Sequence, residues 1–314
     1  MAHEQRWTAD DMADMSGKLV VVTGGNSGIG LEAARAFARK RAHVILACRD
    51  VDKARDAITQ ISALQPSAAL EPMQLDLASL ESVHRFARDF AAKGTPLDVL
   101  CNNAGVMAIP YRKTAEGFEM QLGTNHLGHF ALTGLLLDAI LAAPAARVVN
   151  VSSTAHKAGR MRFDDLQWQR RYWKWPAYAQ SKLANLLFAY ELQRRFERAG
   201  ARAISVACHP GYAATNLQAA GPRMAGSRTM ERIMSLGNAL FSQSAAMGAL
   251  PTLYAATSPD VHGGDYVGPD GFMENKGYPK RTISTPRSHD AQAAQRLWEI
   301  SEQLTSVRFG ALPS

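Results

Sequence analysis

The sequence has little cysteine and no cluster of metal ligands. Only three cysteines occur among 314 residues, Cys48, Cys101 and Cys208, and each lies near the end of a predicted strand. An odd number of cysteines buried in strands favours free thiols and a reducing compartment. We therefore expect a cytoplasmic protein. Because no cysteine or histidine cluster has metal-ligand spacing, we expect no metal site.

The sequence also lacks a run that could cross a membrane. Its longest apolar stretch, residues 127–143, contains His129, Thr133 and Asp138. This stretch is too short and too polar to span a bilayer, so it predicts a buried helix. Residues 1–18 carry charges and have no apolar segment of the kind found in signal peptides. We expect neither a membrane span nor a signal peptide.

A strong excess of one charge is absent as well. The chain has 35 Lys and Arg against 28 Asp and Glu, a net charge of +7. The basic residues are spread over several short clusters, which is typical of solvated helix faces and ends. We therefore expect no nucleic-acid partner. Part of the positive charge is available to an anionic cofactor.

What the sequence does contain is a regular alternation of strand-like and helix-like segments. Strand-like runs recur at 19–23, 44–48, 70–75, 99–102, 148–152 and 204–208, with a further short strand near 264–267. This alternation predicts an α/β fold, a single-domain Rossmann-type doubly wound parallel sheet with helices on both faces. We expect residues 17–314 to form this dinucleotide-binding catalytic domain, after a polar extension at 1–16. Two atypical stretches, at about 154–177 and 212–245, follow strand ends, where such sheets bind ligands.

A glycine-rich turn follows the first predicted strand. Residues 23–30 read Thr-Gly-Gly-Asn-Ser-Gly-Ile-Gly, and a helical pattern begins at Leu31. Glycines let the backbone approach a pyrophosphate, and the helix N-terminus supplies amide donors and the positive end of a dipole. The glycine spacing differs from the Gly-x-Gly-x-x-Gly fingerprint, but the strand, turn and helix together predict a phosphate site.

Tyr178 and Lys182 stand four residues apart in a run that reads as an amphipathic helix. Residues at i and i+4 lie on one face of a helix. An ammonium beside a phenol stabilises the phenolate, so we expect Lys182 to lower the pKa of Tyr178. A phenol tuned toward neutral pH can exchange a proton with a substrate oxygen. Taken alone, the pair is weak evidence, because this spacing is common on helix surfaces and a solvated lysine beside a half-buried tyrosine is the better reading.

Seven motifs in order resemble the short-chain dehydrogenase/reductase family over about residues 17–215. They are the glycine turn at 23–30, Asp76-Leu77, Asn102-Asn103-Ala104-Gly105, Asn125 in Thr-Asn-His-Leu-Gly-His-Phe, the serine strand at 148–153, Tyr178 with Lys182, and His209-Pro210-Gly211. The resemblance implies cofactor contacts at Gly24, Asn26, Ser27, Gly28, Ile29, Gly30, Arg49, Asp76, Leu77, Asn103, Ala104, Gly105, Tyr178, Lys182, Pro210, Gly211 and Thr215. Ala47-Cys48-Arg49, residues 125–130 and the long gap between Ser153 and Tyr178 together resemble the branch of retinol dehydrogenases, WW-domain oxidoreductase and light-dependent protochlorophyllide oxidoreductase.

The same resemblance implies a catalytic group of Asn125, Ser153, Tyr178 and Lys182. Ser153 would orient a substrate carbonyl beside Tyr178, which serves as general acid or base. Lys182 would also bind the nicotinamide ribose, and Asn125 would hold a water through its backbone. The function implied is hydride transfer between a nicotinamide and a carbonyl or alcohol. The alternative is a non-catalytic NADP-binding sensor or scaffold with the same fold.

Arg49 is the residue expected to determine whether the site prefers NADP(H) or NAD(H). In sites that prefer NAD, an acid about 20 residues beyond the glycine turn holds the ribose 2′-hydroxyl. Cys48 stands at that position, and Arg49 follows it. A guanidinium can pair with a 2′-phosphate, so we expect NADP(H) rather than NAD(H). The other reading is that Arg49 caps the strand end, with Asp50 neutralising it.

The long gap between Ser153 and Tyr178 is an insertion rich in aromatic residues. These are Phe163, Trp168, Tyr172, Trp173 and Trp175. They fit the wall of an apolar substrate pocket and fit an ordinary packed layer equally well. The second stretch holds Met224, Met230 and Met234 among glycines, which suits a lid over an apolar ligand or a plain surface helix. The expected partner is a small-molecule carbonyl or alcohol substrate of apolar character, and a homo-oligomer is left open.

Overall fold

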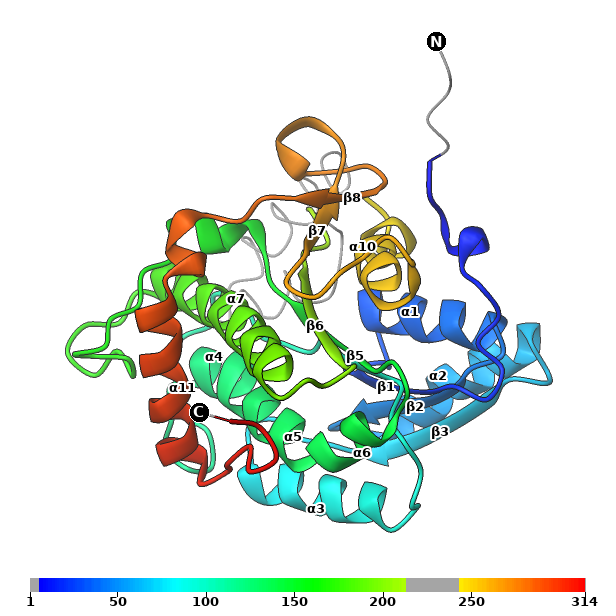
Figure 1. Cartoon of the computed structure of the whole chain (residues 1–314), viewed down its shortest axis with the longest axis horizontal. Coiled ribbons are helices and arrows are strands. Elements are labelled where there is room, and N and C mark those ends of the chain that lie inside the picture. The colour runs from blue at the N-terminus through cyan, green and yellow to red at the C-terminus, as the bar shows by residue number, and fades with distance from the viewer. Residues whose placement is uncertain (1–5, 213–242, 314) are drawn as a thin grey trace.

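Eight strands form one sheet at the centre of this computed structural model, which describes residues 6–212 and 243–313 (Figure 1). The strand order is β3-β2-β1-β4-β5-β6-β7-β8. Neighbours from β3 to β7 pair in parallel, and β8 runs antiparallel to β7. The bounds are β1 (Leu19–Thr23), β2 (His43–Cys48), β3 (Ala69–Gln74), β4 (Val99–Asn102), β5 (Arg147–Val151), β6 (Ile204–Cys208), β7 (Tyr266–Pro269) and β8 (Pro279–Thr282). The doubly wound sheet is therefore confirmed.

Successive side chains of the central strands pack into two separate hydrophobic cores, one on each face of the sheet. Leu19 and Val21 of β1 pack with the layer of α3 (Leu80–Ala91), α5 (Gly128–Leu135) and α7 (Lys174–Arg198). Val20 and Val22 pack with α1 (Gly28–Arg39), α2 (Val51–Leu64) and α10 (Ala245–Thr257). This follows from the two-residue period of a strand, which sends successive side chains to opposite faces. Because both faces are covered, β1 is apolar from Leu19 to Val22 and buried along its whole length, as expected of a central parallel strand.

Several helices begin at residues that accept a hydrogen bond from the first turn. Asp50, Ser79, Ser244 and Asp290 cap helices in this way. The helices and helical turns are η1 (Ala9–Asp11), α1 (Gly28–Arg39), α2 (Val51–Leu64), α3 (Leu80–Ala91), α4 (Met120–Leu122), η2 (Gly123–Leu127), α5 (Gly128–Leu135), α6 (Leu137–Ala142), η3 (Thr154–Ala158), α7 (Lys174–Arg198), α10 (Ala245–Thr257), η4 (Phe272–Glu274), η5 (Pro286–His289) and α11 (Ala291–Thr305). Residues 127–143 lie in η2, α5 and α6, and most of them are buried, as predicted.

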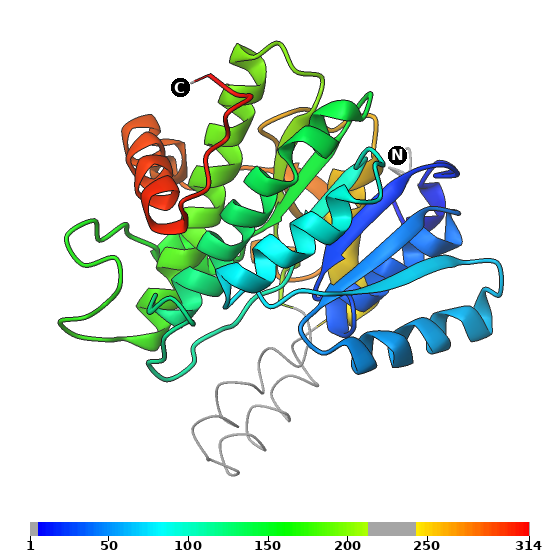
Figure 2. The same ribbon diagram turned by 90° about the horizontal axis from the view of Figure 1, so that it is seen from below.

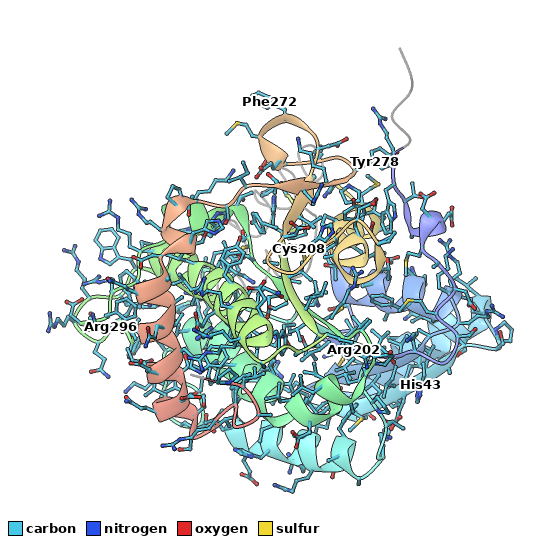
Figure 3. All side chains as sticks on the ribbon, viewed as in Figure 1. His43, Arg202, Cys208, Phe272, Tyr278 and Arg296 are labelled. Carbon is cyan, nitrogen blue, oxygen red and sulfur yellow. The ribbon has the colours of Figure 1, made fainter. Side chains whose placement is uncertain are left out.

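Strand β8 was not predicted from the sequence. It reads Pro-Lys-Arg-Thr, and Lys280 and Arg281 are exposed. It lacks the apolar run that marks the other strands because it lies at the edge of the sheet, where charged residues and proline are tolerated. The antiparallel pairing creates a hairpin, residues 266–282, whose tip carries the exposed Phe272 (Figure 3).

The predicted amphipathic pattern of the helix that carries Tyr178 is wrong. Helix α7 is buried continuously from Ala177 to Gln193. It packs on the sheet with one side, and α11 lies against its outer side (Figure 2). Polar residues of α7, such as Gln180, Asn185 and Glu191, are also buried, and each has hydrogen-bond partners.

Residues 6–16 lie along the outside of α1 and α10. Met12 and Met15 are buried in the core of that face, and the ring of Trp7 meets that of Tyr254 edge-on at 5.1 Å. Arg39 and Arg41 pair with acids of the segment. The extension is thus fastened to the sheet layer by apolar contacts and ion pairs.

The three cysteines are buried and free, in agreement with the sequence. In residues 6–212 and 243–313, no helix combines the length and the apolar character that a bilayer crossing requires.

Candidate active site

The site lies at the carboxyl ends of the parallel strands, where four loops and one helix converge. The glycine turn follows β1, residues 103–106 follow β4, Ser153 follows β5, and Pro210-Gly211 follows β6. Helix α7 adds Tyr178 and Lys182 from the side. This is the rim at which open α/β sheets bind ligands.

Tyr178 is buried against Ser153. Only 4% of Tyr178 is exposed, whereas Ser153 is half-buried and accepts a hydrogen bond from the backbone N–H of Ala155 at 3.1 Å. Burial raises the pKa of Tyr178 to about 12, and the hydrogen bond with Ser153 opposes this rise. The prediction of a lowered pKa is therefore wrong in this structure, and the phenol holds its proton at neutral pH.

Lys182 does not oppose this rise because its ammonium points elsewhere. Its Nζ donates to the main-chain oxygen of Val151 at 3.0 Å and lies 5.8 Å from the centroid of the Tyr178 ring. Burial lowers the pKa of Lys182 to about 8. The ammonium is thus directed at the end of β5 rather than at the Tyr178 hydroxyl. Ser152 holds the same turn of α7 by donating to the Lys182 carbonyl at 2.8 Å.

Asn125 lies in the π-helical turn η2 with its side-chain hydrogen bonds satisfied. Its Oδ1 accepts from the Val106 N–H at 2.8 Å, and its Nδ2 donates to the Val106 oxygen and to Ser181 Oγ, each at 2.9 Å. A Cβ added to Gly105 would lie 2.9 Å from Asn125 Oδ1 and 3.7 Å from Lys182 Nζ. The structure therefore brings Asn125 and Lys182 to one place, beside the loop after β4.

The glycine turn has the shape of a phosphate cradle. Gly28 has φ +54°, and a Cβ on Gly30 would lie 2.4 Å from the Gly24 carbonyl, so neither position suits a side chain. Helix α1 begins here, and Ser27 makes no side-chain hydrogen bond to its first turn. Asn26 and Ile29 lie half-buried in the same turn. These residues fit the pyrophosphate of a dinucleotide at a helix N-terminus.

The loop after β4 is fastened to the same turn through Thr23. The N–H groups of Asn103 and Ala104 both donate to Thr23 Oγ1 at 2.9 Å, and Asn103 Nδ2 donates to the Thr23 carbonyl at 2.8 Å. Sequence reasoning placed Asn103 and Ala104 in the site but assigned no role to the hydroxyl that holds them. Thr23 is the first residue of the glycine turn, and this position in the sequence could have indicated that its hydroxyl has a role in the site.

Arg49 is exposed, and no carboxylate in the described part of the chain pairs with it. Asp50 instead caps α2 by accepting from the Lys53 N–H and forms an ion pair with Lys53 Nζ at 2.9 Å. The reading in which Asp50 neutralises Arg49 is therefore not what the structure shows.

Asp76 and Leu77 follow β3 on the cofactor side. Asp76 Oδ1 accepts from the Ala78 N–H at 3.0 Å, which shapes the turn, and Leu77 is buried against α5. On the other side, Gly211 has φ +65°, and the Pro210 carbonyl accepts from Gln243 Nε2 at 2.7 Å. Thr215 and the three methionines of the second stretch lie outside the described residues.

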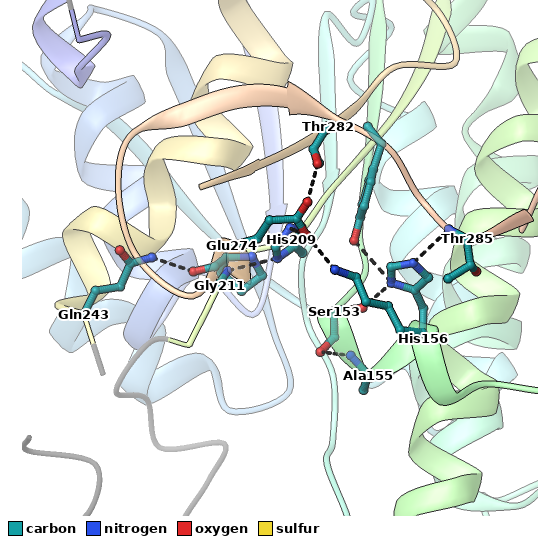
Figure 4. Close-up of polar contacts among 12 residues, drawn as sticks. Ser153, Ala155, His156, His209, Gly211, Gln243, Glu274, Thr282 and Thr285 are labelled. Atoms are coloured by element: carbon teal, nitrogen blue, oxygen red, sulfur yellow. Dashed lines mark hydrogen bonds and ion pairs between the residues drawn. The ribbon is translucent and has the colours of Figure 1, made fainter. Parts of the chain in front are cut away.

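Glu274, at the tip of the β7–β8 hairpin, was missed by sequence reasoning (Figure 4). Its Oε2 lies 3.0 Å from Lys157 Nζ and 3.4 Å from His209 Nε2, and Thr282 donates to its other oxygen. The contact with His209 is the largest cause that holds the pKa of Glu274 well below its usual range. Lys157 follows Ser153 by one turn, and His209 precedes Pro210. One carboxylate therefore ties the serine loop to the Pro-Gly turn.

The five aromatic residues of the insertion fall into two groups. Phe163 and Trp168 pack against arginines, and the Tyr172 hydroxyl donates to the Ile109 oxygen at 2.9 Å. These three are packed structure. Trp173 and Trp175 are each 50% exposed, and the ring of Trp175 meets the Tyr178 ring edge-on at 6.3 Å.

Comparison with known proteins agrees with this geometry. A family model described as short chain dehydrogenase matches residues 18–225. Human retinol dehydrogenase 12 is 40% identical over 297 residues, which cover 94% of this chain and 88% of the relative. A crystal structure of an uncharacterised protein from Mycobacterium paratuberculosis is 42% identical, with a TM-score of 0.80 and coverage of 97% and 99% of the two chains. A structure described as an NAD(P)-dependent gluconate 5-dehydrogenase from Beutenbergia cavernae, with bound NADP at low occupancy, is 26% identical with a TM-score of 0.58, over 78% of this chain and 91% of that chain.

Proposed function

The chain belongs to the short-chain dehydrogenase family, in its retinol dehydrogenase branch, and on this premise we propose that it is an NADP(H)-dependent oxidoreductase for apolar carbonyls or alcohols, with Tyr178 as general acid and base. Membership makes it an oxidoreductase that transfers hydride with a nicotinamide cofactor. The observation that carries the finer proposal is the burial of Tyr178 against Ser153, with Lys182 one helical turn further along α7.

The chain's own groups suit the reducing direction. When bound, the nicotinamide supplies or accepts the hydride. Ser153 Oγ donates a hydrogen bond to the substrate oxygen and orients it toward Tyr178. Tyr178 holds its proton at neutral pH, because burial raises its pKa to about 12, and gives that proton to the substrate oxygen. Oxidation of an alcohol requires the reverse transfer to Tyr178.

The preference for NADP(H) rests on Arg49. Its guanidinium is exposed beside the end of β2, and it has no acidic partner among the described residues. A 2′-phosphate placed there would gain a charge-assisted hydrogen bond. The bound NADP in the structure from Beutenbergia cavernae supports the same choice.

The preference for an apolar substrate rests on Trp175. Its half-exposed ring lies edge-on to Tyr178, so a substrate that reaches the phenol passes beside an indole. The name of the human relative adds retinol and retinal to the compounds worth testing.

A screen tests the proposal. Aldehydes, ketones and alcohols are offered with NADP(H) and with NAD(H), and turnover is followed by nicotinamide absorbance. We expect turnover with NADP(H) that disappears in Tyr178→Phe while cofactor binding stays close to the parent. Binding of the cofactor without turnover of any substrate would favour the sensor or scaffold alternative.

A further inference from the structure

One buried histidine joins the cofactor side of the site to the catalytic group. His129, on α5, is 2% exposed. Its Nδ1 lies 3.0 Å from the main-chain oxygen of Asn125, and its Nε2 lies 2.9 Å from Thr23 Oγ1. Thr23 opens the glycine turn, and Asn125 is in the π-helical turn η2. A single imidazole ring therefore spans two parts of the site that are far apart in the sequence.

The surrounding hydrogen bonds determine which nitrogen of His129 carries the proton. Thr23 Oγ1 accepts from the backbone N–H groups of residues 103–104, which uses both lone pairs of the hydroxyl. Its one hydrogen is left to donate, and His129 Nε2 at 2.9 Å is closer than the Cys101 oxygen at 3.2 Å. The Asn125 carbonyl can only accept, so Nδ1 carries the proton.

A neutral ring satisfies every partner, and a protonated ring does not. A second N–H on His129 would present Thr23 Oγ1 with a third donor for two lone pairs. Burial agrees with the neutral form, because it lowers the pKa of His129 to about 4, with the charge of Lys182 acting in the same direction. His129 therefore stays neutral near pH 7 and keeps its hydrogen bonds to both Thr23 and Asn125.

The link continues from Asn125 to the catalytic tyrosine. Asn125 Nδ2 donates to Ser181 Oγ at 2.9 Å, and Ser181 Oγ donates to the Tyr178 carbonyl at 2.8 Å. A hydrogen-bonded chain therefore runs from Thr23 through His129, Asn125 and Ser181 to the helix turn that carries Tyr178. The turn that carries Asn125 is π-helical, a local departure from the α-helix of a kind often found at functional sites.

We infer that His129 is a positioning residue, whose neutral ring sets the peptide of Asn125, and through it the turn of Tyr178, at a fixed place relative to the glycine turn. The inference rests on the proposed function. His129 itself touches neither the reacting atoms nor, by the resemblance of the glycine turn, the cofactor phosphates. The Asn125 carbonyl is the group to which the family resemblance assigns a water, so its orientation bears directly on proton transfer.

The chain offers a matched control three residues upstream. His126 is 1% exposed, and burial lowers its pKa to about 3. Its Nε2 lies 2.8 Å from Ser301 Oγ on α11, so it faces away from the glycine turn. Replacing either histidine by leucine removes a buried imidazole from the same segment, but only the change at His129 cuts the link to Thr23.

The experiment compares His129→Leu, His129→Gln and His126→Leu with the parent enzyme. For each, kcat, the Kd of NADPH and the melting temperature are measured. We expect His129→Leu to lower kcat roughly ten- to hundredfold, as a displacement of about 1 Å does, with NADPH affinity nearly unchanged because residues 103–104 still hold Thr23. His129→Gln should recover most of kcat, because the amide group of glutamine can both donate to the Asn125 carbonyl and accept from the Thr23 hydroxyl. His126→Leu should lose melting temperature but keep kcat.

Equal kcat losses in the two leucine variants, or a glutamine variant as slow as His129→Leu, would overturn the inference. If His129→Leu does not fold, His129→Gln is compared with His129→Asn, whose shorter side chain cannot meet both partners, and equal kcat values would overturn it. A second measurement does not depend on enzyme activity. The Val106 N–H donates to Asn125 Oδ1, so its hydrogen-exchange rate reports how firmly Asn125 is held. This exchange should be faster in His129→Leu than in the parent and unchanged in His126→Leu. A parent enzyme that binds NADPH without turnover would refute the proposed function alone, and the exchange result would still decide the role of His129.

Discussion

Trp175 provides the sharpest test of how the site selects a substrate. Half of its surface is exposed, and its ring centroid lies 6.3 Å from that of Tyr178. A substrate whose oxygen reaches the phenol has room to lay an apolar body on the exposed half of the indole. Replacing Trp175 by alanine removes that surface and leaves the catalytic group intact.

The size of the effect follows from the exposed area. An aromatic side chain buries about 150–250 Å² when covered, so half of a tryptophan offers roughly 100 Å². At about 25 cal/mol per Å² this amounts to roughly 2.5 kcal/mol for a substrate that covers all of it. A substrate that covers half gains roughly 1.2 kcal/mol. We therefore expect kcat/KM for a fused-ring aromatic aldehyde to fall by about eightfold to seventyfold in Trp175→Ala.

Trp173 is the matched control. It is also 50% exposed, but its ring lies against Arg171, with the guanidinium 4.6 Å from the ring centroid. Trp173→Ala should leave kcat/KM for both the aromatic aldehyde and a short aliphatic aldehyde near the parent values. Neither variant should change the melting temperature much, because surface substitutions usually alter stability by less than about 0.5 kcal/mol. A parallel decline of both aldehydes in Trp175→Ala, or the same selective loss in Trp173→Ala, would refute the role assigned to Trp175.

Three further predictions concern the cofactor, the hairpin and the phenol. Arg49→Ala should weaken NADP(H) by about 1.5–3 kcal/mol and NAD(H) hardly at all, since a charged hydrogen bond to the 2′-phosphate is lost; equal losses in the two Kd values would make Arg49 a structural residue. Glu274→Gln should lower both the melting temperature and the affinity for NADP(H), because the charge that pairs with Lys157 is removed. Glu81→Gln, in the exposed first turn of α3, should leave the affinity for NADP(H) unchanged. Tyrosinate absorbance, taken as the difference between the parent and Tyr178→Phe, should show Tyr178 ionising near pH 12, and an ionisation near neutral pH would mean that Lys182 outweighs burial after all.

The sheet was predictable because its strands carry their own signal. The runs at 19–23, 99–102 and 204–208 coincide with β1, β4 and β6 as they stand in the structure. Each is short, mostly apolar and almost wholly buried, so composition and burial point the same way. Strand β8 carries no such signal, because an exposed edge pairs through its backbone and leaves its side chains to water.

The contacts that join the loops of the site could not be predicted in the same way. His129 meets Thr23 across 106 residues of sequence, and Glu274 meets Lys157 across 117. Neither pair has a fixed spacing, because the strand order of the folded sheet, not the chain, brings them together. The motifs located the loops, but the polar side chains that hold the loops in place became visible only in the structure.

The charge states of Tyr178 and Lys182 show a different limit. Their spacing places both on one face of α7, and from this alone a positive charge should stabilise the phenolate. Whether it does depends on which is larger, the attraction or the cost of burying the charged form. Here both groups are almost fully buried, so each pKa moves toward the neutral species, to about 12 for the phenol and about 8 for the ammonium. Both groups therefore hold their protons near pH 7, which is the protonation state that the proposed donation of a proton from Tyr178 to a carbonyl oxygen requires.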